Sequence, residues 1–548
     1  MNRSLLALLL LLVAKQALAQ TTLPTDSRPA RAATVITGRV VVSSDNFPIA
    51  NARVLARAAG GPTSVRIATT DDDGKFQLTN LAPASYVIRV AAAGYVPDLV
   101  QADTPATFYR PGENVTLRMI KGGIITGRVV NQNGQPMALA RVRAVRVKDG
   151  EGNAVRDSAV RDWTTDDRGI YRAYGLEPGA YVVSANATTY HPSATLDNAI
   201  VVNVVNGNET GGVDIKYRPE HSYAVSGMIV GGAAQGYAPL RRAVISVTLS
   251  HATSGVTVAF TTIIPNAGNS VFNFDAVPDG VYELTAQAAP GSKDATLAQP
   301  QTVNVRGASV TGIVLTLAPM GSVSGRLLLE PATSIEAAES CTEVPATALQ
   351  ETLITAKAET QRKTKHVPLL ASLLPVEAQP DARGEFLLTN MSAGKYALNL
   401  KLASSRLYVR EIALEPGPMT ARFNGLTLKS GERVNGLIIK LASGAASVTG
   451  RVSADTDFLS RLNVYAVPAK REHADDLLRY AHAQVQPDGS FSLQHLAPDR
   501  YFLLPVSATD LLDAKARAAL RRDAERANVS VDLKPCQRVT GYNLRFTP

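Results

Sequence analysis

The side chains that could carry hydrolytic chemistry in this chain are first of all its seven histidines. A zinc peptidase needs a His-x-x-Glu pair and a third, distant ligand, and no histidine here has a glutamate three residues further on. His473 and Asp476 are spaced by about one helical turn, but no third ligand accompanies them, so we interpret them as a solvated pair. We therefore predict no metal site at the histidines, which are His191, His221, His251, His366, His473, His482 and His495.

The other patterns that mark catalysis are missing as well. A Gly-x-Ser-x-Gly nucleophile motif would need serine where Val323 stands between Gly321 and Gly325. A phosphate-binding loop would need a glycine five residues before Gly74, and there is none. The repeats described below leave no stretch of about 150 residues for a catalytic domain. We predict that the protein is not an enzyme and has no cofactor. The alternative is an enzyme whose catalytic site lies in residues 331–380.

Acidic turns offer oxygen ligands of the kind that calcium prefers. Asp71-Asp72-Asp73-Gly74 and Asp166-Asp167 are the richest, whereas later copies keep only Asn266, Asp381 and Asp488. Because an aspartate in a β-turn bonds its own backbone, we favour turn chemistry over calcium and predict no metal.

Trp163 is the only tryptophan and the candidate contact for a ligand such as a sugar ring. We expect it at a strand edge, where the first repeat has Ala68, outside the shared core. Tyr190, Tyr237 and Tyr408 could assist, although packing between neighbouring units is the favoured interpretation of all these aromatics.

Cys341 and Cys536 are the only cysteines. Two cysteines in an exported chain favour one disulfide over two free thiols. We therefore predict a Cys341–Cys536 bond that joins a segment of the fourth unit to the last hairpin of the fifth.

One pattern, repeated five times, must position all of these residues. Each copy opens on a motif of four residues. A small residue comes first, glycine second, arginine or methionine third and an apolar residue fourth. The glycines are Gly38, Gly127, Gly227, Gly325 and Gly450. Each copy then has an aromatic residue followed ten positions later by a tyrosine. The pairs are Phe76 and Tyr86, Tyr171 and Tyr181, Phe272 and Tyr282, Phe386 and Tyr396, and Phe491 and Tyr501. The spacing predicts a tandem array of small domains.

Each copy contains short alternating segments, bounded by turns every eight to twelve residues. In the second copy these are 124–130, 140–145, 170–173, 180–185, 201–205 and 213–217. The pattern predicts an all-β fold of antiparallel β-sandwiches. The aromatic residue and the tyrosine are expected on antiparallel neighbours, both facing the interior, with the tyrosine hydroxyl bonded to backbone.

We predict five tandem sandwiches. Their bounds are 34–121, 122–220, 221–319, 320–444 with an insertion at 331–380, and 445–548 with a helix at about 507–527. In that helix Leu511, Leu512, Ala516, Ala519 and Leu520 share one side, which favours a covering helix over a partner-binding one. Linkers are very short, so we expect a rod-like or gently bent string.

The first nineteen residues have the features of a secretory signal, followed by a linker at 20–33. Arg3 precedes the apolar run Leu5–Val13, and Ala17-Leu18-Ala19 suits signal peptidase. Nine apolar residues are fewer than the roughly 20 that span a bilayer, although an N-terminal anchor is the alternative. We predict export to the periplasm, cell surface or medium, with no transmembrane segment after signal removal.

The formal net charge is +9, but the basic residues are dispersed. The two local clusters, 362–365 and 515–522, are interpreted as solvated faces, and no nucleic-acid partner is expected.

The units resemble the carboxypeptidase regulatory-like domain, a transthyretin-like (Ig-like) sandwich grouped with Cna-B-type and starch-binding-like domains. The opening Gly-Arg-Val strand, Asp72-Asp73-Gly74-Lys75-Phe76 and Leu176-Glu177-Pro178-Gly179-Ala180-Tyr181 carry the resemblance. It is weakest in the third unit, which has Met228 for Arg and no Asp-Gly turn before Phe272. The resemblance implies an accessory module of the kind found in secreted and surface proteins of many activities.

Together these observations predict an exported, non-catalytic array that serves as a structural spacer or an adhesion and interaction module at the cell envelope. Its partner would be an envelope protein or polysaccharide. The alternative is a carbohydrate-binding protein that uses exposed loops and Trp163.

Overall fold

The structure is a computed structural model that describes most of residues 34–546. The residues left out are 1–33, 61–64, 99–107, 151, 153–154, 156–160, 219–220, 232–243, 265–269, 289–295, 331–343, 345–346, 359–375, 416–424, 454–458, 460–461, 487, 508, 510, 512 and 547–548. The predicted signal peptide and linker, 1–33, thus lie outside the described residues. Strands dominate, and α3 (Ala514–Ala527) is the only α-helix in the described part.

The first unit consists of two four-stranded sheets, in the orders β4-β1-β8-β6 and β3-β2-β5-β7. Apolar residues from both sheets alternate inward and form one core around Ile36, Val54 and Leu78. The strands are β1 (Thr34–Val42), β2 (Arg53–Ala58), β3 (Val65–Thr69), β4 (Lys75–Leu81), β5 (Tyr86–Ala91), β6 (Tyr95–Pro97), β7 (Phe108–Tyr109) and β8 (Asn114–Lys121).

The second unit repeats this plan, with β12-β9-β16 in one sheet and β11-β10-β13-β14 in the other. The short strand β17 also pairs with β9, and β15 pairs with β13. The strands are β9 (Gly123–Val130), β10 (Arg141–Asp149), β11 (Asp162–Thr164), β12 (Ile170–Leu176), β13 (Gly179–Ala185), β14 (Thr189–Tyr190), β15 (Val202–Val204), β16 (Glu209–Thr210) and β17 (Ile215–Lys216).

In the third unit the two layers join into one eight-stranded sheet, because β23 pairs with both β22 and β25. The order is β20-β19-β22-β23-β25-β18-β21, with β24 on β22. The strands are β18 (Ser222–Gly231), β19 (Ile245–His251), β20 (Thr257–Ile263), β21 (Val271–Pro278), β22 (Gly280–Ala288), β23 (Thr296–Ala298), β24 (Gln301–Val305) and β25 (Val310–Pro319).

The fourth unit has sheets β29-β26-β33-β31 and β28-β27-β30-β32. Two of its strands, β27 and β28, lie inside the segment 331–380 that we expected to be an insertion. They hold the sheet positions that β2 and β3 hold in the first unit, so part of this segment belongs to the shared fold. The strands are β26 (Gly321–Glu330), β27 (Leu353–Ala358), β28 (Val376–Ala378), β29 (Glu385–Met391), β30 (Gly394–Lys401), β31 (Leu407–Leu414), β32 (Leu426–Leu428) and β33 (Arg433–Ser443).

The fifth unit has sheets β37-β34-β40 and β36-β35-β38-β39. The helix begins later than the expected 507, because Ser507 still belongs to β38 and Asp513 caps the helix by accepting a bond from the Lys515 amide. The strands are β34 (Ala446–Ser453), β35 (Leu462–Pro468), β36 (Ala481–Gln484), β37 (Ser490–Leu496), β38 (Arg500–Ser507), β39 (Ser530–Asp532) and β40 (Arg538–Arg545).

The repeated glycine lies directly opposite the repeated aromatic residue in every unit. Gly325 pairs with Phe386, and a β-carbon added to Gly325 would lie 2.6 Å from the Phe386 ring and 2.2 Å from the Leu437 carbonyl oxygen. The other four glycines have the same crowded surroundings. This close approach of a ring and a neighbouring strand is the physical reason for the repeated glycine.

The repeated tyrosine lies across the core from the repeated aromatic residue. Phe76 is on β4 and Tyr86 on β5, which belong to different sheets, so our expectation of antiparallel neighbours was wrong. Their burial is confirmed, and so is the bond to backbone. In all five units the tyrosine hydroxyl donates to the carbonyl four residues earlier, at 2.8–3.1 Å.

The sheets are mixed rather than wholly antiparallel. In every unit the opening strand pairs in parallel with the closing strand, as β1 does with β8. This pairing lets the opening strand lie between the aromatic-bearing strand and the closing strand.

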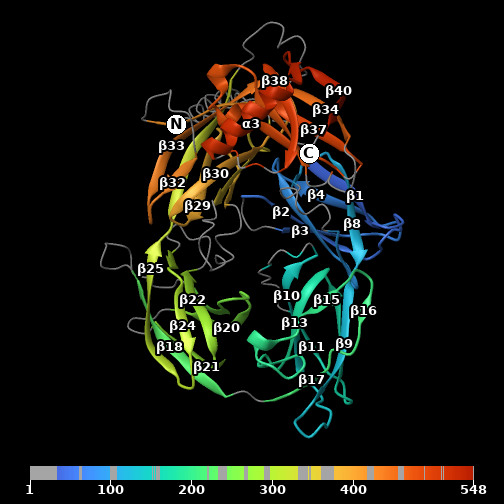
Figure 1. Cartoon of the computed structure of the whole chain (residues 1–548), viewed down its shortest axis with the longest axis vertical. Helices are drawn as coiled ribbons and strands as arrows, with labels where there is room; N and C mark the ends of the chain where they lie inside the picture. The colour runs from blue at the N-terminus through green and yellow to red at the C-terminus, as the bar shows by residue number, and fades with distance from the viewer. Residues whose placement is uncertain are drawn as a thin grey trace, which may run out of the picture.

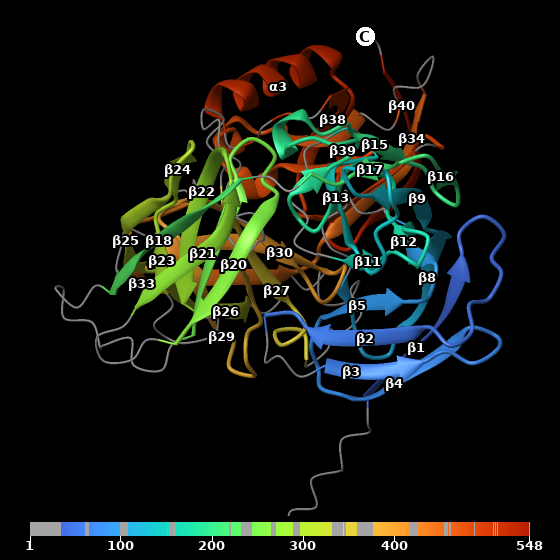
Figure 2. The same ribbon diagram turned by 90° about the horizontal axis from the view of Figure 1, so that it is seen from below.

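The units follow a closed course instead of a rod, so that expectation was wrong. In Figure 1 the chain runs from the blue first unit through the teal second and green third units and returns to the orange fourth and red fifth units beside its start. Figure 2 also places strands of the first and fourth units next to each other, and hydrogen bonds join them. The exact boundaries of the five domains stay a prediction.

Candidate functional site

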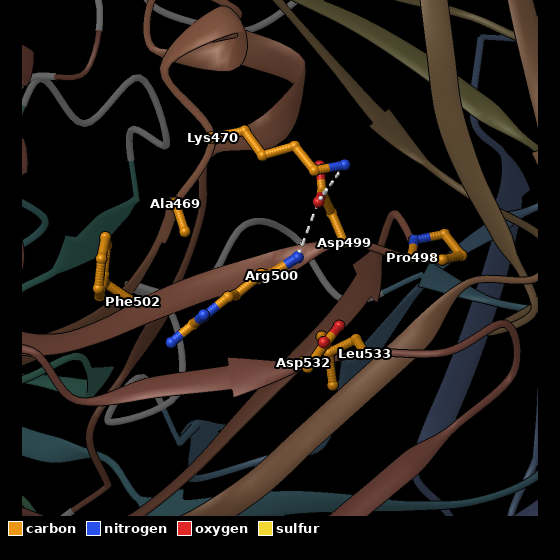
Figure 3. Close-up of a pocket in the computed structure, with 8 residues that line it drawn as sticks. All are labelled: Ala469, Lys470, Pro498, Asp499, Arg500, Phe502, Asp532 and Leu533. Carbon is orange, nitrogen blue, oxygen red and sulfur yellow. Dashed lines mark hydrogen bonds and ion pairs between the residues drawn. The ribbon is translucent and has the colours of Figure 1, made fainter.

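A groove of about 690 Å³ opens in the fifth unit (Figure 3). Along β38 the residues Tyr501 and Leu503 alternate into the core, which places Arg500 and Phe502 on the outer face of the sheet. The groove therefore lies on the face turned away from the sandwich core. Its lining residues are Ala469, Lys470, Pro498, Asp499, Arg500, Phe502, Asp532 and Leu533.

Helix α3 covers the adjoining part of this face. Leu520 and Ala524 pack against Tyr465 and Val467, whose side chains are buried there. Arg521 donates to the carbonyl oxygens of Pro468 at 2.8 Å and Ala469 at 3.0 Å, and so fixes the segment that borders the groove. The favoured interpretation of α3 as a covering helix is consistent with this packing.

Asp499 organises the rim of the groove. Its side chain is only 5% exposed and contacts the Lys470 ammonium at 3.1 Å and His473 Nδ1 at 2.9 Å, while it accepts the Arg500 amide at 2.8 Å. Burial alone would raise the pKa of Asp499, but the Arg500 amide, the Lys470 ammonium and His473 outweigh it and lower the pKa. The carboxylate thus stays ionised and pairs with Lys470, which also lines the groove (Figure 3).

Arg500 and Asp532 provide charge on the floor of the groove. They are direct cross-strand partners on β38 and β39, yet no ion pair is formed between them in the part of the chain that the structure describes. Arg500 Nη2 donates instead to Ser530 Oγ at 3.1 Å. Besides these charges the groove offers apolar surface at Phe502, and its lining has no serine, threonine or cysteine. Such a lining suits binding, and it contains no hydroxyl or thiol nucleophile.

A second surface joins the first unit to the fourth. Ser85 is fully buried, and its hydroxyl donates to the Glu351 carbonyl at 2.7 Å. Gly60, with a φ of +61°, lies so close to β28 that an added β-carbon would be 2.7 Å from Ala378 Cα. With its amide oriented to satisfy both neighbours, Gln379 donates to the Ala59 carbonyl at 3.0 Å. The two backbones are therefore in direct contact.

Cationic side chains extend this interface. Arg110 donates to the Leu402 carbonyl at 2.6 Å, and the Lys401 ammonium lies 4.5 Å from the centre of the Phe108 ring. Burial, together with the positive charge of the neighbouring Arg110, lowers the pKa of Lys401 to about 8. Burial also raises the pKa of Glu377, which lies 3.9 Å from Arg57.

A third contact joins the second and third units. His251, 5% exposed, contacts Asp197 through Nε2 at 3.0 Å and Ser254 Oγ through Nδ1 at 3.0 Å. The set resembles a serine-hydrolase triad in composition only, because the adjoining cavity of about 20 Å³ has room for one water molecule at most. Sequence reasoning missed this contact, since Asp197 and His251 belong to different units and no motif links them.

The predicted ligand contact, Trp163, lies on the edge strand β11 opposite Val142, as expected. Its ring, however, is partly buried and packs against the core of the second unit. Tyr190 is buried in a cluster with Val256 of the third unit, which confirms packing between neighbours for this residue. Tyr408 is half-buried on β31, and Tyr237 lies outside the described residues.

The acidic turns use their carboxylates internally. Asp71 accepts the Lys75 amide at 2.7 Å, Asp166 the Ile170 amide at 2.7 Å and Asp381 the Glu385 amide at 2.9 Å. His473 pairs with Asp499 rather than with Asp476, which caps a 3₁₀ helix. Among the described residues, no group of three or more histidine, cysteine or acidic side chains is arranged to hold a metal ion.

Cys536 is disulfide-bonded and nearly buried. Its predicted partner, Cys341, lies outside the described residues, so the pairing stays a prediction. Of the helices that the structure describes, none combines the length and the hydropathy needed to span a bilayer.

Comparison with protein families matches the first two units. Residues 35–118 and 124–216 fit the family model of the carboxypeptidase regulatory-like domain. Each of these two segments is similar to that domain family. These are the units whose sequences resemble that family most closely. No curated protein matches the chain.

Solved structures similar to this chain include two bacterial pilins and repeat units of a bacterial collagen-binding protein. The minor pilin GBS52 of Streptococcus agalactiae is 14% identical, over 34% of this chain and 98% of its own, with a TM-score of 0.21. Two B repeat units of the collagen-binding protein of Staphylococcus aureus are 13% identical, over 75% of this chain and all of theirs, with a TM-score of 0.14. The major pilin BcpA of Bacillus cereus is 12% identical, over 59% of this chain and all of its own, also with a TM-score of 0.14. Similarity at this level supports no inference of function.

Proposed function

We propose that the protein is an exported, non-catalytic structural or adhesion module of the cell envelope that presents the groove of the fifth unit to a partner. The observation that carries the proposal is the docking of the first unit on the fourth through Gly60, Ser85 and Arg110. Contacts of this kind fix the positions of the β-sandwiches relative to one another, as a scaffold requires. In such a scaffold the groove of the fifth unit has a fixed position relative to the other units.

The test has two parts, localisation and binding. The full-length chain is expressed with its own N-terminus, and the envelope and cytoplasmic fractions are compared. We expect the protein in the envelope fraction or the medium, and retention in the cytoplasm would contradict the proposal.

Binding is then measured with Arg500→Ala and, as a matched control, Lys534→Ala on the same unit. Lys534 is exposed and does not line the groove. We expect an envelope partner, protein or polysaccharide, to lose at least tenfold in affinity with Arg500→Ala and to be unaffected by Lys534→Ala. Equal binding by both variants would exclude the groove as the binding site.

Polysaccharide binding is the second candidate, favoured by the groove rather than by Trp163. A glycan that binds saturably would support it. Because Trp163 packs against the core, a loss of binding confined to Trp163→Ala would place the glycan site on the second unit instead.

A further inference from the structure

The closing strand of the fifth unit, β40, has an open edge. In the first, third and fourth units a further strand pairs antiparallel with the closing strand, namely β6 on β8, β23 on β25 and β31 on β33. In the fifth unit the sheet ends at β40, with the order β37-β34-β40, in the part of the chain that the structure describes. Figure 1 shows β40 at the outer border of this unit. The backbone groups along such an edge are able to pair with an added strand.

The fifth unit uses the corresponding segment of its chain differently. In the other three units the covering strand lies between two strands of the opposite sheet that pair with each other, as β31 lies between β30 and β32. In the fifth unit these two strands are β38 and β39, and the segment between them forms helix α3. Helix α3 packs against Tyr465 and Val467 of the opposite sheet. Among the described residues, the place beside β40 is therefore left without its strand.

The core beneath this edge is less well covered than in the other units. Four positions after the partner of the repeated glycine, the closing strands carry Met119, Leu317, Leu441 and Phe546. The first three lie directly opposite a residue of the covering strand and are at most 1% exposed. Phe546 has no such strand beside it and is only partly buried at the border of the fifth core. An added strand with apolar side chains on its inner face would bury Phe546 as its counterparts are buried.

The charges of the closing strands indicate the charge of the added strand. In the fourth unit Lys440 on β33 donates to Glu411, its direct partner on β31, at 2.9 Å. The equivalent residue on β40, three positions after the partner of the repeated glycine, is Arg545, which is exposed. Arg538 on the same strand is exposed as well, and β40 contains no acidic residue. An acidic side chain thus complements this edge, whereas a second copy of β40 would bring basic residues together.

We propose that the edge of β40 binds an extended segment of another protein by addition of a β-strand. The Phe546 amide donates to the Ser453 carbonyl, so the alternate residues Asn543 and Arg545 direct their backbone groups away from β34 and toward the added strand. The segment runs antiparallel to β40, covers Phe546 with apolar side chains and places an acidic side chain opposite Arg545. This site is separate from the groove, which lies on the other sheet.

The first test uses a fluorescent peptide with the sequence of residues 406–415, which contains the covering strand of the fourth unit and Glu411. We expect saturable binding to the full-length chain, measured by fluorescence anisotropy. Asn543→Pro removes an outward amide from the edge and should weaken binding about tenfold or more. Asn543→Ala keeps that amide and is the matched control, with binding like that of the wild-type chain. No binding to the wild-type chain, or equal binding by both variants, would overturn the proposal.

The second test exchanges charges and does not depend on the folding of a proline variant. Arg545→Glu should weaken binding of the peptide about tenfold or more, and a peptide with Glu411→Lys should restore binding to this variant. Affinities that do not respond to either change would contradict the proposal.

Light scattering of the chain without peptide distinguishes another protein from a second copy as the occupant. We expect the wild-type chain to be a monomer. A wild-type dimer that Asn543→Pro or Arg545→Glu converts to a monomer would show that the edge binds a second copy, and would overturn the proposal.

Discussion

The interior of each unit and the contacts between units are built on different principles. Every interior repeats one device, a glycine under an aromatic ring with a tyrosine bonded four residues back, as at Gly325, Phe386 and Tyr396. The contact between the first and fourth units uses Gly60, Ser85 and Arg110, none of which belongs to the repeat. Repetition therefore marks what folds each unit, and non-repeated residues determine how the units are arranged.

The largest effect is expected from a side chain at a repeated glycine. Gly325→Val places methyl groups where the Phe386 ring and the Leu437 carbonyl already lie within 2.6 Å of the added β-carbon. We expect a loss of more than about 4 kcal/mol in the stability of the fourth unit, measured by urea unfolding. Ser322→Val, three residues earlier on the half-exposed face of β26, is the control and should change stability by less than about 0.5 kcal/mol. Similar midpoints for both variants would contradict the role of the glycine.

A smaller effect is expected from the repeated tyrosine. Tyr501→Phe removes the buried bond to the Ala497 carbonyl and should cost about 1–2 kcal/mol. Tyr174→Phe, whose ring is half exposed, serves as the control for the change in side chain. If both variants unfold at the same urea concentration, the hydroxyl bond contributes nothing to the core.

The pH dependence of the contact between the first and fourth units follows from Lys401. In the closed form burial lowers its pKa to about 8, whereas a free lysine titrates near 10.4. The closed form thus binds fewer protons between these values, and closure should strengthen as pH rises from 7 to about 10.5. Glu377, whose pKa is raised, acts in the opposite direction but in the acidic range.

Hydrogen exchange at residues 85–91 and 351–358, compared at pH 7 and pH 9.5 after correction for intrinsic rates, measures this dependence. Lys401→Met should abolish it. A contact that loosens at pH 9.5 in the wild-type chain would show that the sign is wrong.

The smallest effect on stability is expected at the repeated arginine, because its side chain is exposed. Arg39 donates from Nε to the Asp73 carbonyl at 2.7 Å on the surface. Arg39→Met reproduces the residue that the third unit already has at Met228 and should cost no more than about 0.5 kcal/mol. A loss of more than about 2 kcal/mol in urea unfolding would mean that this arginine belongs with the core residues.

The sequence was sufficient for the parts of the molecule that repeat. Glycines, aromatics and tyrosines at fixed spacing predicted the β-sandwiches, the buried pairs and the tyrosine bonds to backbone. The assignment of the pair to neighbouring strands was wrong because the strands that bear Phe76 and Tyr86 enter different sheets. Spacing alone does not distinguish a hairpin from a crossing between two sheets.

The arrangement of the units and the groove could not be predicted in the same way. Arg500 and Asp532 have the pattern of ordinary exposed strand residues, and they meet only because β38 pairs with β39. Ser85 and Glu351 are separated by 266 positions, and the bond between them involves a backbone carbonyl that any residue type supplies. Trp163 drew attention because tryptophan is rare here, but its ring is used for packing.

The central claim, that the first unit docks on the fourth, is tested most directly by small-angle X-ray scattering of the monomer fraction at neutral pH. A compact chain of this length has a radius of gyration of about 24 Å. The closed course predicts a radius of gyration only moderately above this value, below about 35 Å. We also expect the radius of gyration to increase in the Gly60→Arg variant. An extended string of sandwiches would give a radius of gyration of roughly twice the compact value or more. If the wild-type monomer has such a radius, and Gly60→Arg does not change it, the account is contradicted.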